Sequence, residues 1–505
     1  MKKRIAVIGS GFSGLSAAAY AAQTGNDVHV FEKNSIPGGR AGNFKASGYT
    51  FDKGPSWYWM PDVIENFFKD FGYTSSDFFK LVKLDPQFEL VTQNLSVKIP
   101  ESYSDLRAVF ESLEPESGKK LDEFMRAAKF KYEIGMGSFV NKPCNHIGEF
   151  LSPKIISAAF SLDLFTNFRK YVAKFFKNPV LKTLMEFPII FLGASPEKIP
   201  ALYSMMNYGG FVLGTHYPLG GFYELVKAMH SLAEKQGAKF YFNHLVEKIQ
   251  TNDNYVTSLL VNGKTLEFDA VIASSDYHHT ETLLNKTHRN YKEDYWETRT
   301  FAPSCLLWYL GFNKKIKGLQ HHTLFFENEL DGHLRNIYET KTWPEKPLFY
   351  ACCPSKTDNT VAPENHENLF LLMPLSPGIN DEEALREKYL KEMLNRIEKF
   401  TGETDLEKNI DFRRSYCVND FIEEYNAYKG NAYGLANTLQ QTAILKPSLH
   451  NKKLRNLVYA GQLTIPGPGV PPSIISGKIA AGEINKKTHT PERYNLKNYL
   501  NEKIV

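Results

Sequence analysis

The sequence predicts an α/β protein with additional α+β parts, built around a parallel sheet whose strands come from separated stretches of the chain. Three observations predict this fold class. A strand-helix-strand pattern with a glycine-rich turn occupies the first 32 residues. Mostly helical patterns follow between residues 61 and 185, and α/β patterns with a second glycine-rich turn return after residue 221. A chain of 505 residues is long enough for two or three domains.

The N-terminal unit predicts a strand at 4–9, an alanine-rich helix at 12–23 and a second strand at 27–32. Between the first strand and the helix lies a G-x-G-x-x-G turn, which lets a backbone approach a pyrophosphate at a helix N-terminus. Glu32 ends the second strand, where its carboxylate can accept hydrogen bonds from ribose hydroxyls. The sequence therefore predicts a Rossmann-like dinucleotide site containing Gly9, Ser10, Gly11, Phe12, Ser13, Gly14, Glu32 and Lys33.

In the rest of the chain, the sequence pattern predicts both helices and strands. Helical periodicity appears at 62–71, 119–134, 222–236 and 382–401, and a final helix is expected from about Ser473 to Asn485. Strands are expected at 239–242, 255–260, 265–273, 304–312, 368–373 and 457–461. Asn262-Gly263 predicts a hairpin turn between two of these strands.

Composition excludes several classes of function. A net charge of +4 spread over 505 residues argues against nucleic acid as a partner. Five scattered cysteines without a C-x-x-C pair indicate no metal site and a reducing, cytoplasmic setting. No signal peptide is recognised at the N-terminus, and no apolar run approaches 18 residues, so a spanning helix is not expected.

The choice of dinucleotide depends on Gly38, Gly39 and Arg40, which follow Glu32 by six residues. Two glycines permit close backbone approach, and an arginine can reach a phosphate oxygen. This combination resembles the extended FAD fingerprint of the flavoproteins that include amine oxidases, protoporphyrinogen oxidase and the carotenoid desaturases. Gly54, Pro55 and Ser56 resemble the next segment of that pattern, which in the family lies against the flavin; read alone, the segment is an ordinary turn.

The C-terminal part extends the resemblance. Residues 458–462 (Val-Tyr-Ala-Gly-Gln) and 466–471 (Pro-Gly-Pro-Gly-Val-Pro) are similar to the closing motif of bacterial-type phytoene desaturases. The likeness implies that Gly461 approaches the ribityl or phosphate part of FAD, that Val470 and Pro471 pack near the isoalloxazine, and that Val246 contacts adenine. Gln462 departs from the pattern, because many flavoproteins have an acidic residue there.

Three regions follow from these matches. Residues 1–90, 221–290 and 450–490 are expected to form a discontinuous FAD-binding domain, residues 91–220 a helical domain facing substrate or membrane, and residues 291–449 an α+β substrate domain. The absence of a second G-x-G-x-x-G argues against a resident NAD(P) site, which leaves oxygen or a quinone as the electron acceptor.

The resemblance implies FAD-dependent desaturation of a lipophilic carotenoid, either a phytoene-type intermediate or a hydroxylated carotenoid at its 3,4 position. Flavin-dependent isomerisation or saturation of polyenes, amine oxidation and simple carotenoid carriage are the alternatives. His216 and Tyr217 are the candidates for proton transfer, although a neutral structural histidine and a core tyrosine are favoured over catalytic roles.

A basic amphipathic helix is expected between residues 168 and 177. Apolar residues recur at helical spacing, with basic residues on the intervening face. Such a helix could lie in a membrane interface together with residues 187–192, or it could cover the protein's own core. The apolar residues are Phe168, Tyr171, Val172, Phe175 and Phe176, and the basic ones are Arg169, Lys170, Lys174 and Lys177.

Overall fold

Five parallel strands from distant parts of the chain form the first sheet. The computed structural model describes residues 2–145 and 162–487. The strand order is β19-β13-β1-β2-β9, and every pairing is parallel. β1 is almost entirely buried, as expected for a central strand covered on both faces. The strands are β1 (Arg4–Ile8), β2 (Asp27–Phe31), β9 (Lys239–Tyr241), β13 (Ala270–Ala273) and β19 (Leu457–Tyr459).

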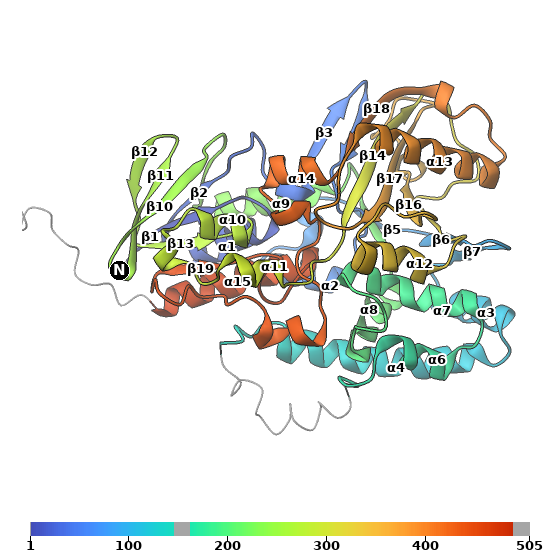
Figure 1. Ribbon diagram of the computed structural model, residues 1–505, viewed down its shortest axis with the longest axis horizontal. Coiled ribbons are helices and arrows are strands. Elements are labelled where there is room, and N and C mark those ends of the chain that lie inside the picture. Colours follow the sequence, from blue (N-terminus) through green and yellow to red (C-terminus); the bar gives the residue numbers. More distant parts are fainter. Residues whose placement is uncertain (1, 146–161, 488–505) are drawn as a thin grey trace, which may run out of the picture.

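Three helices pack beside this sheet, at the left of Figure 1: α1 (Phe12–Gln23), α9 (Tyr223–Lys235) and α15 (Val470–Lys487). The first and last cross closely, because a Cβ added to Gly477 would lie 2.3 Å from the carbonyl oxygen of Ser13. Ser16 Oγ also donates a hydrogen bond of 2.7 Å to the carbonyl of Ile474. The N- and C-terminal parts of the chain therefore build one Rossmann-like unit, and the predicted α/β fold is confirmed.

One expected strand is wrong. Residues 265–273 form two strands in different sheets: β12 (Lys264–Glu267) pairs with β11 (Tyr255–Val261), whereas β13 joins the parallel sheet. The break lies at Phe268 and Asp269, where the Asp269 carboxylate accepts a hydrogen bond of 2.7 Å from Arg4 N. The predicted hairpin turn is confirmed, since Asn262 and Gly263 have φ of 44° and 74° between antiparallel strands.

A second sheet of seven strands lies beside the first, with the order β18-β14-β17-β16-β15-β6-β7. Helix α13 (Glu383–Thr401) covers one face with Tyr389, Leu390 and Met393, as Figure 1 shows at the upper right. Because β6 and β7 come from the first hundred residues, this sheet also joins distant parts of the chain. Its strands are β6 (Phe88–Val91), β7 (Ser96–Ile99), β14 (Ser304–Phe312), β15 (His322–Phe325), β16 (Phe349–Cys352), β17 (Glu367–Leu375) and β18 (Ile410–Tyr416).

The division of the chain into three domains stays a prediction. Of its expected segments, residues 146–161 and 488–490 lie outside the described part of the chain. The smaller elements connect the two sheets and the helical part. They are β3 (Asn43–Ala46), β4 (Tyr49–Asp52), α2 (Pro61–Lys69), β5 (Leu81–Lys83), α8 (Met205–Asn207), β8 (His216–Pro218), β10 (Val246–Asn252), α10 (Tyr277–Thr282), α11 (Glu293–Glu297), α12 (Leu330–Arg335) and α14 (Val418–Tyr425).

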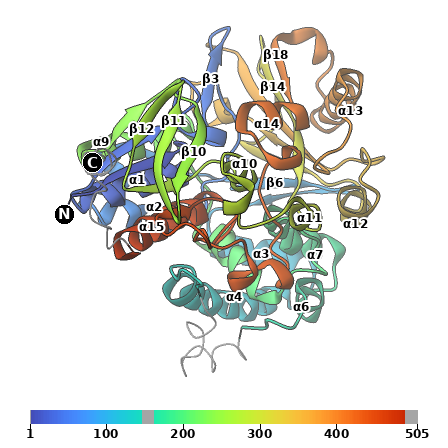
Figure 2. The ribbon, with the colours of Figure 1, turned by 60° about the vertical axis from the view of Figure 1, so that its left-hand side comes forward.

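The helical part contains α3 (Tyr103–Leu113), α4 (Ser117–Ile134), α6 (Phe168–Phe175) and α7 (Pro179–Glu186), which lie below the sheets in Figure 2. The apolar stripe of α6 is turned inward: Phe168 and Val172 are fully buried, and the ring of Tyr171 lies 5.4 Å from that of Phe124 in α4. The stripe therefore covers the protein's own core, and these buried side chains are not available to a bilayer. Within the described residues, none of the helices combines the length and apolarity needed to cross a membrane.

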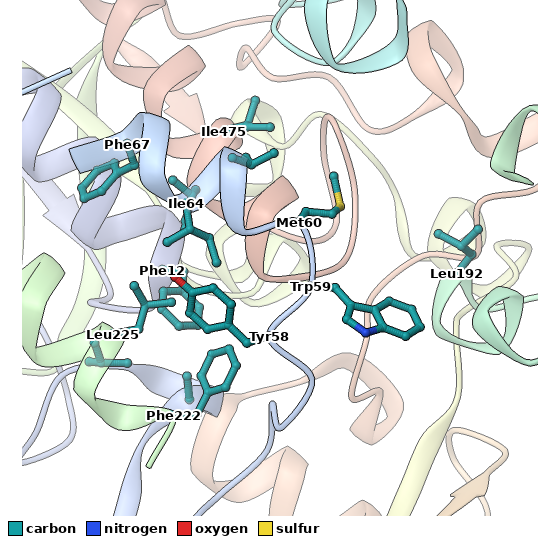
Figure 3. Packing of buried hydrophobic residues seen from close by; sticks show 14 of the residues in the cluster. Phe12, Tyr58, Trp59, Met60, Ile64, Phe67, Leu192, Phe222, Leu225 and Ile475 are labelled. Carbon is teal, nitrogen blue, oxygen red and sulfur yellow. The ribbon is translucent and has the colours of Figure 1, made fainter. Parts of the chain in front are cut away.

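The loop after β4 packs between the two halves of the molecule. Figure 3 shows Tyr58 turned toward Phe12 and Phe222, while Trp59 points the opposite way, to the side of Leu192. The ring of Tyr58 lies 5.8 Å from that of Phe222, and Trp59 Nε1 donates a 2.8 Å hydrogen bond to Thr215 Oγ1. Successive side chains thus anchor this loop to the nucleotide unit on one side and to the helical part on the other.

Candidate active site

A cavity of about 1170 Å³ begins at the glycine-rich turn and continues between the two sheets and the helical part. It exceeds the roughly 300–1,000 Å³ typical of small-molecule sites. The predicted cofactor residues that line it are Gly9, Ser10, Gly11, Phe12, Ser13, Glu32, Lys33, Gly38, Gly39, Arg40, Gly54, Pro55, Ser56, Val246, Gly461, Val470 and Pro471. Gly14 is not in this lining; a Cβ there would lie 2.0 Å from the carbonyl oxygen of Gly9, so it keeps helix and strand close.

Glu32 is held at the carboxyl end of β2 by hydrogen bonds to its own surroundings. Its Oε2 accepts from Ser10 N at 2.9 Å and from Ser10 Oγ at 2.8 Å, and its Oε1 accepts from Asn34 N at 2.9 Å. The side chain is only 5% exposed. The side chain is therefore fixed at the cavity wall, where its oxygens could accept hydrogen bonds from ribose hydroxyls.

Arg40 is a half-buried cation with an unused donor. Its Nη2 donates to the carbonyl of Asn431 at 3.2 Å, whereas its Nε has no hydrogen-bond partner. Burial lowers the pKa of Arg40 and raises the pKa of Asp276, and the two charges attract each other. The preceding Gly38 and Gly39 both have positive φ, 113° and 54°. A half-buried guanidinium with a free, buried Nε–H in a glycine-lined wall fits an anionic ligand such as a pyrophosphate.

Two helix N-termini open on the same cavity. The start of α1 has no side-chain cap, because its N-cap is Gly11. The final helix was expected from about Ser473 but begins at Val470, so Val470 and Pro471 belong to its first turn. Unpaired N–H groups at a helix start favour negative charge, and α1 supplies them. In α15, Pro471 and Pro472 have no N–H, and Ser473 N donates to the carbonyl of Gly469 at 3.0 Å. Gly461, with φ of 114°, lies nearby, since a Cβ there would be 3.2 Å from Ser13 Oγ.

Beyond the polar end, aliphatic and aromatic side chains form the cavity wall. In the described stretch of wall formed by the helical part and the inner face of the second sheet, the basic side chains are Lys142 and His333, and no acidic side chain occurs. Burial lowers the pKa of His333 to about 4, so it is neutral near pH 7. This stretch includes Phe139, Leu164, Phe187, Ile190, Tyr203, Met205, Met206, Leu307, Leu324, Phe326, Leu334, Ile337 and Leu372.

The two residues suggested for proton transfer do not line this cavity. His216 and Tyr217 lie in β8, which pairs with β5, and Tyr217 donates a 3.4 Å hydrogen bond to Asp358. Burial lowers the pKa of His216 and raises that of Tyr217, so both stay neutral. Neither residue is in the lining of the described cavity, and a role in proton transfer stays a prediction.

Sequence reasoning missed a polar group in the cavity wall. The Tyr350 hydroxyl lies 3.0 Å from Ser56 Oγ and 2.5 Å from His322 Nδ1. Ligand atoms of His321, His322 and Cys352 also lie within 4.8 Å of one another, all in buried side chains. Residues 322–325 and 349–352 are not among the strands expected from the sequence, and the group is revealed by the pairing between these two strands.

Fold and cavity together define a flavin-dependent oxidoreductase. The sequence model of the family described as flavin containing amine oxidoreductase matches residues 12–485 of this chain. Carotenoid 3,4-desaturase of Haloarcula japonica is 38% identical over 94% of this chain and 97% of its own. A zeta-carotene-forming phytoene desaturase of Myxococcus xanthus is 29% identical over 96% and 95%. The chain belongs to the flavin containing amine oxidoreductase family and, within it, to the carotenoid desaturases.

Solved structures agree on the fold. Putrescine oxidase, 14% identical, matches with a TM-score of 0.62 over 96% of this chain and 99% of its own. The cofactor is FAD, and the residues present fit it: the free Arg40 Nε, the N-terminus of α1 and the glycine-lined wall supply donors for a pyrophosphate. The predictions of family, enzyme class and cofactor are thus confirmed.

Proposed function

We propose that this FAD-dependent oxidoreductase desaturates a carotenoid, removing a hydride and a proton from a CH2–CH2 unit beside a conjugated chain. The cavity carries the proposal, because it joins a dinucleotide site to a long apolar compartment in one continuous space. Relatives named carotenoid and phytoene desaturases support the same substrate class. An apolar wall suits a polyene, which offers no polar groups to bind.

Within that class, a 3,4-desaturation of an acyclic or hydroxylated carotenoid is favoured over a phytoene-type reaction. The supporting observation is identity: 38% to the carotenoid 3,4-desaturase against 29% to the phytoene desaturase, over nearly whole chains in both cases. The two reactions differ at the substrate's end group and need the same flavin chemistry.

The same proposal assigns the cofactor contacts. Arg40 and the N-terminus of α1 would hold the pyrophosphate, Glu32 the adenosine ribose, and Val246 the adenine through its backbone. Gly461 would lie beside the ribityl chain, and Val470 with Pro471 would border the isoalloxazine. The residues from Gly54 to Ser56 would complete the wall. Their shared lining of one cavity supports these roles.

Bound FAD supplies the two-electron acceptor for the hydride. The chain's own residues must exclude water and orient the polyene. The apolar wall excludes water, and Trp57 and Trp59 place aromatic rings in it, 5.3 Å apart. Aromatic faces attract positive charge, so these rings would favour the allylic cation that forms when the hydride leaves.

Anaerobic incubation of the purified protein with candidate carotenoids tests the proposal. Desaturation predicts that the flavin absorption bleaches while the polyene absorption shifts to the red. A hydroxylated monocyclic or acyclic carotene should react, and phytoene should react more slowly. Isomerised product without flavin bleaching would instead indicate the isomerase alternative, and bleaching by amines alone would indicate an amine oxidase.

We further propose that the substrate reaches the cavity from a membrane at its cytoplasmic face, with oxygen or a quinone as the final electron acceptor. Leu439 and Ile444 line the cavity yet are 44% and 40% exposed, and Leu445 beside them is 53% exposed. Exposed apolar side chains at a cavity wall support contact with lipid there rather than through α6.

A further inference from the structure

We propose that His321, His322 and Cys352 bind a zinc ion in the second sheet, next to the wall of the large cavity. One ring nitrogen of each histidine and the Cys352 sulfur lie within 4.8 Å of one another, and all three side chains are buried. Imidazole and thiolate are ligands that zinc prefers in proteins. The site goes beyond the proposed function, because neither FAD nor a carotenoid takes part in it.

The pairing of two strands builds this cluster. In the antiparallel pair β15 and β16, His322 lies directly opposite Cys352, and His321 immediately precedes β15. The imidazole centres of the two histidines are 4.5 Å apart. The register of the sheet therefore sets the positions of all three ligands before an ion arrives. Cysteine spacing along the sequence gave no sign of the cluster, because its members meet only through this pairing.

His322 has one nitrogen engaged and one unpaired. Tyr350 donates its only O–H proton to Ser56 Oγ at 3.0 Å, so the tyrosine oxygen accepts from His322 Nδ1, 2.5 Å away. His322 Nε2 then carries a lone pair and has no hydrogen-bond partner among the described residues, although the side chain is fully buried. A buried acceptor without a partner costs stability, and a metal ion would satisfy it.

His321 repeats this arrangement. Its Nδ1 lies 2.7 Å from Thr357 Oγ1, whereas its Nε2 is buried and finds no partner in the part of the chain that the structure describes. The residue is 5% exposed. Histidine ligands of metals commonly donate their other N–H to an oxygen, which fixes the ring and aims the free nitrogen. Thr357 and Tyr350 supply such an oxygen to the two imidazoles.

The space beside the cluster suits a cation. A small cavity of about 20 Å³ is lined by His321 and Cys352, and this volume is large enough for one ion or one water molecule. Its lining includes Asp52 and, among the described residues, no lysine or arginine. No fixed positive charge in this lining therefore opposes a metal ion.

Binding requires a small contraction and the loss of one proton. Zinc bonds of about 2.0 Å to nitrogen and 2.3 Å to sulfur place tetrahedral ligand atoms roughly 3.3–3.6 Å apart, so atoms within 4.8 Å would close by at most roughly 1–1.5 Å. The Cys352 thiol releases its proton to solvent, and the sulfur electron pair forms the bond to zinc. No oxidation or reduction takes place.

The ion would also brace the wall of the large cavity. The imidazole of His322 stacks on Trp57, with ring centres 4.3 Å apart and planes inclined by 13°. Trp57 and Tyr350 both line the large cavity. A metal that fixes His322 therefore helps to fix two side chains of that wall.

Metal analysis and zinc-edge X-ray absorption of the FAD-loaded protein, equilibrated with excess zinc and then desalted, test the inference. We expect about one zinc per chain, with nitrogen ligands near about 2.0 Å and one sulfur ligand near about 2.3 Å. Cys352→Ser and His322→Gln should each lose the stoichiometric zinc. Thr357→Val, which removes only the hydroxyl beside His321, should weaken zinc binding by about 10- to 100-fold.

Cys353→Ser is the matched control. Cys353 adjoins Cys352 in sequence, but it packs in the other core cluster and donates a 2.6 Å hydrogen bond to Glu367, so this variant should keep its zinc. Thr357 is exposed, so Thr357→Val should fold even where a substitution of a buried ligand does not, and it then decides by its affinity for zinc.

Three results would overturn the inference: no zinc above background in the wild type, zinc without a sulfur ligand, or unchanged zinc affinity in Thr357→Val. These measurements use no carotenoid, so each of them leaves the proposed function intact. Conversely, a zinc-loaded protein that desaturates none of the carotenoids would reject the proposed function and keep the metal site.

Discussion

At the scale of single residues, the cavity depends on a few charged groups that burial has left partly unpaired. Glu32 is satisfied by Ser10 and Asn34, but Arg40 keeps a free Nε. Such groups cost stability in the protein alone and gain partners when an anionic ligand binds. The unpaired Arg40 Nε in the wall of the dinucleotide site therefore lowers the stability of the free protein and gains a hydrogen-bond partner when the ligand binds.

A buried lysine outside the cavity lining, Lys446, leads to a prediction on pH. It is 4% exposed, its Nζ has no hydrogen-bond partner, and it lies behind the turn at Gly467. Burial lowers its pKa from 10.5 to about 7. Between pH 7 and 10.5 the unfolded chain binds a proton that the folded chain does not, so the contribution of this residue to stability rises with pH through that window.

We expect Lys446→Met to remove that rise and to increase the free energy of unfolding at pH 7 by about 4 kcal/mol. Urea titrations of both proteins at pH 7 and pH 10 measure it. Lys453→Met, at an exposed position, controls for loss of a lysine. Parallel stability profiles for wild type and Lys446→Met would contradict the prediction.

At the scale of elements, close helix crossing holds the discontinuous nucleotide unit together. Helix α15 follows the last strand of the sheet and returns across α1, the first helix of the chain. The crossing requires a residue without a side chain at Gly477, which faces the backbone of Ser13. The C-terminal segment thereby contributes both to the cavity wall and to the packing of the N-terminal unit.

Two glycine substitutions in α15 test this packing. Gly477→Ala should lower the free energy of unfolding by about 1–3 kcal/mol, because its Cβ would lie 2.3 Å from a carbonyl oxygen. Gly482→Ala, where a Cβ meets nothing within 4 Å, should raise it by about 0.5–1 kcal/mol through helix propensity. Chemical denaturation of both variants measures the difference; equal effects would show that the crossing is loose.

At the scale of the whole molecule, the cavity links three parts of the fold. Its polar end lies at the parallel sheet, and its apolar stretch lies between the seven-stranded sheet and the helices. Exposed apolar residues also border the cavity: Leu439 and Ile444 line it, and Leu445 lies beside them.

Lipid binding should therefore depend on residues 439–445 and not on α6. In liposome flotation, the double variant Ile444→Ser, Leu445→Ser should lose binding, with a change in unfolding free energy within about 1 kcal/mol because both side chains are exposed. Phe168→Ala should instead cost about 3–5 kcal/mol of stability, since its side chain is fully buried. Unchanged flotation of the double variant would contradict this.

The sequence by itself determined the nucleotide unit. The glycine turn, the helix at 12–23, Glu32 and the hairpin at Asn262-Gly263 are local patterns whose physical causes lie within a few residues. Glycines with positive φ occur in short turns of few conformations, so the local sequence was sufficient to predict these elements. The family resemblance then identified FAD as the dinucleotide.

Only the tertiary structure decided what depends on partners distant along the chain. Amphipathic spacing shows that one face of 168–176 is buried, but not whether lipid or Phe124 covers it. The split of residues 265–273 follows from pairing with two different sheets. Likewise His216 lies outside the cavity, and Tyr350 meets His322, because strand register is set by contacts between strands that no short stretch of sequence contains.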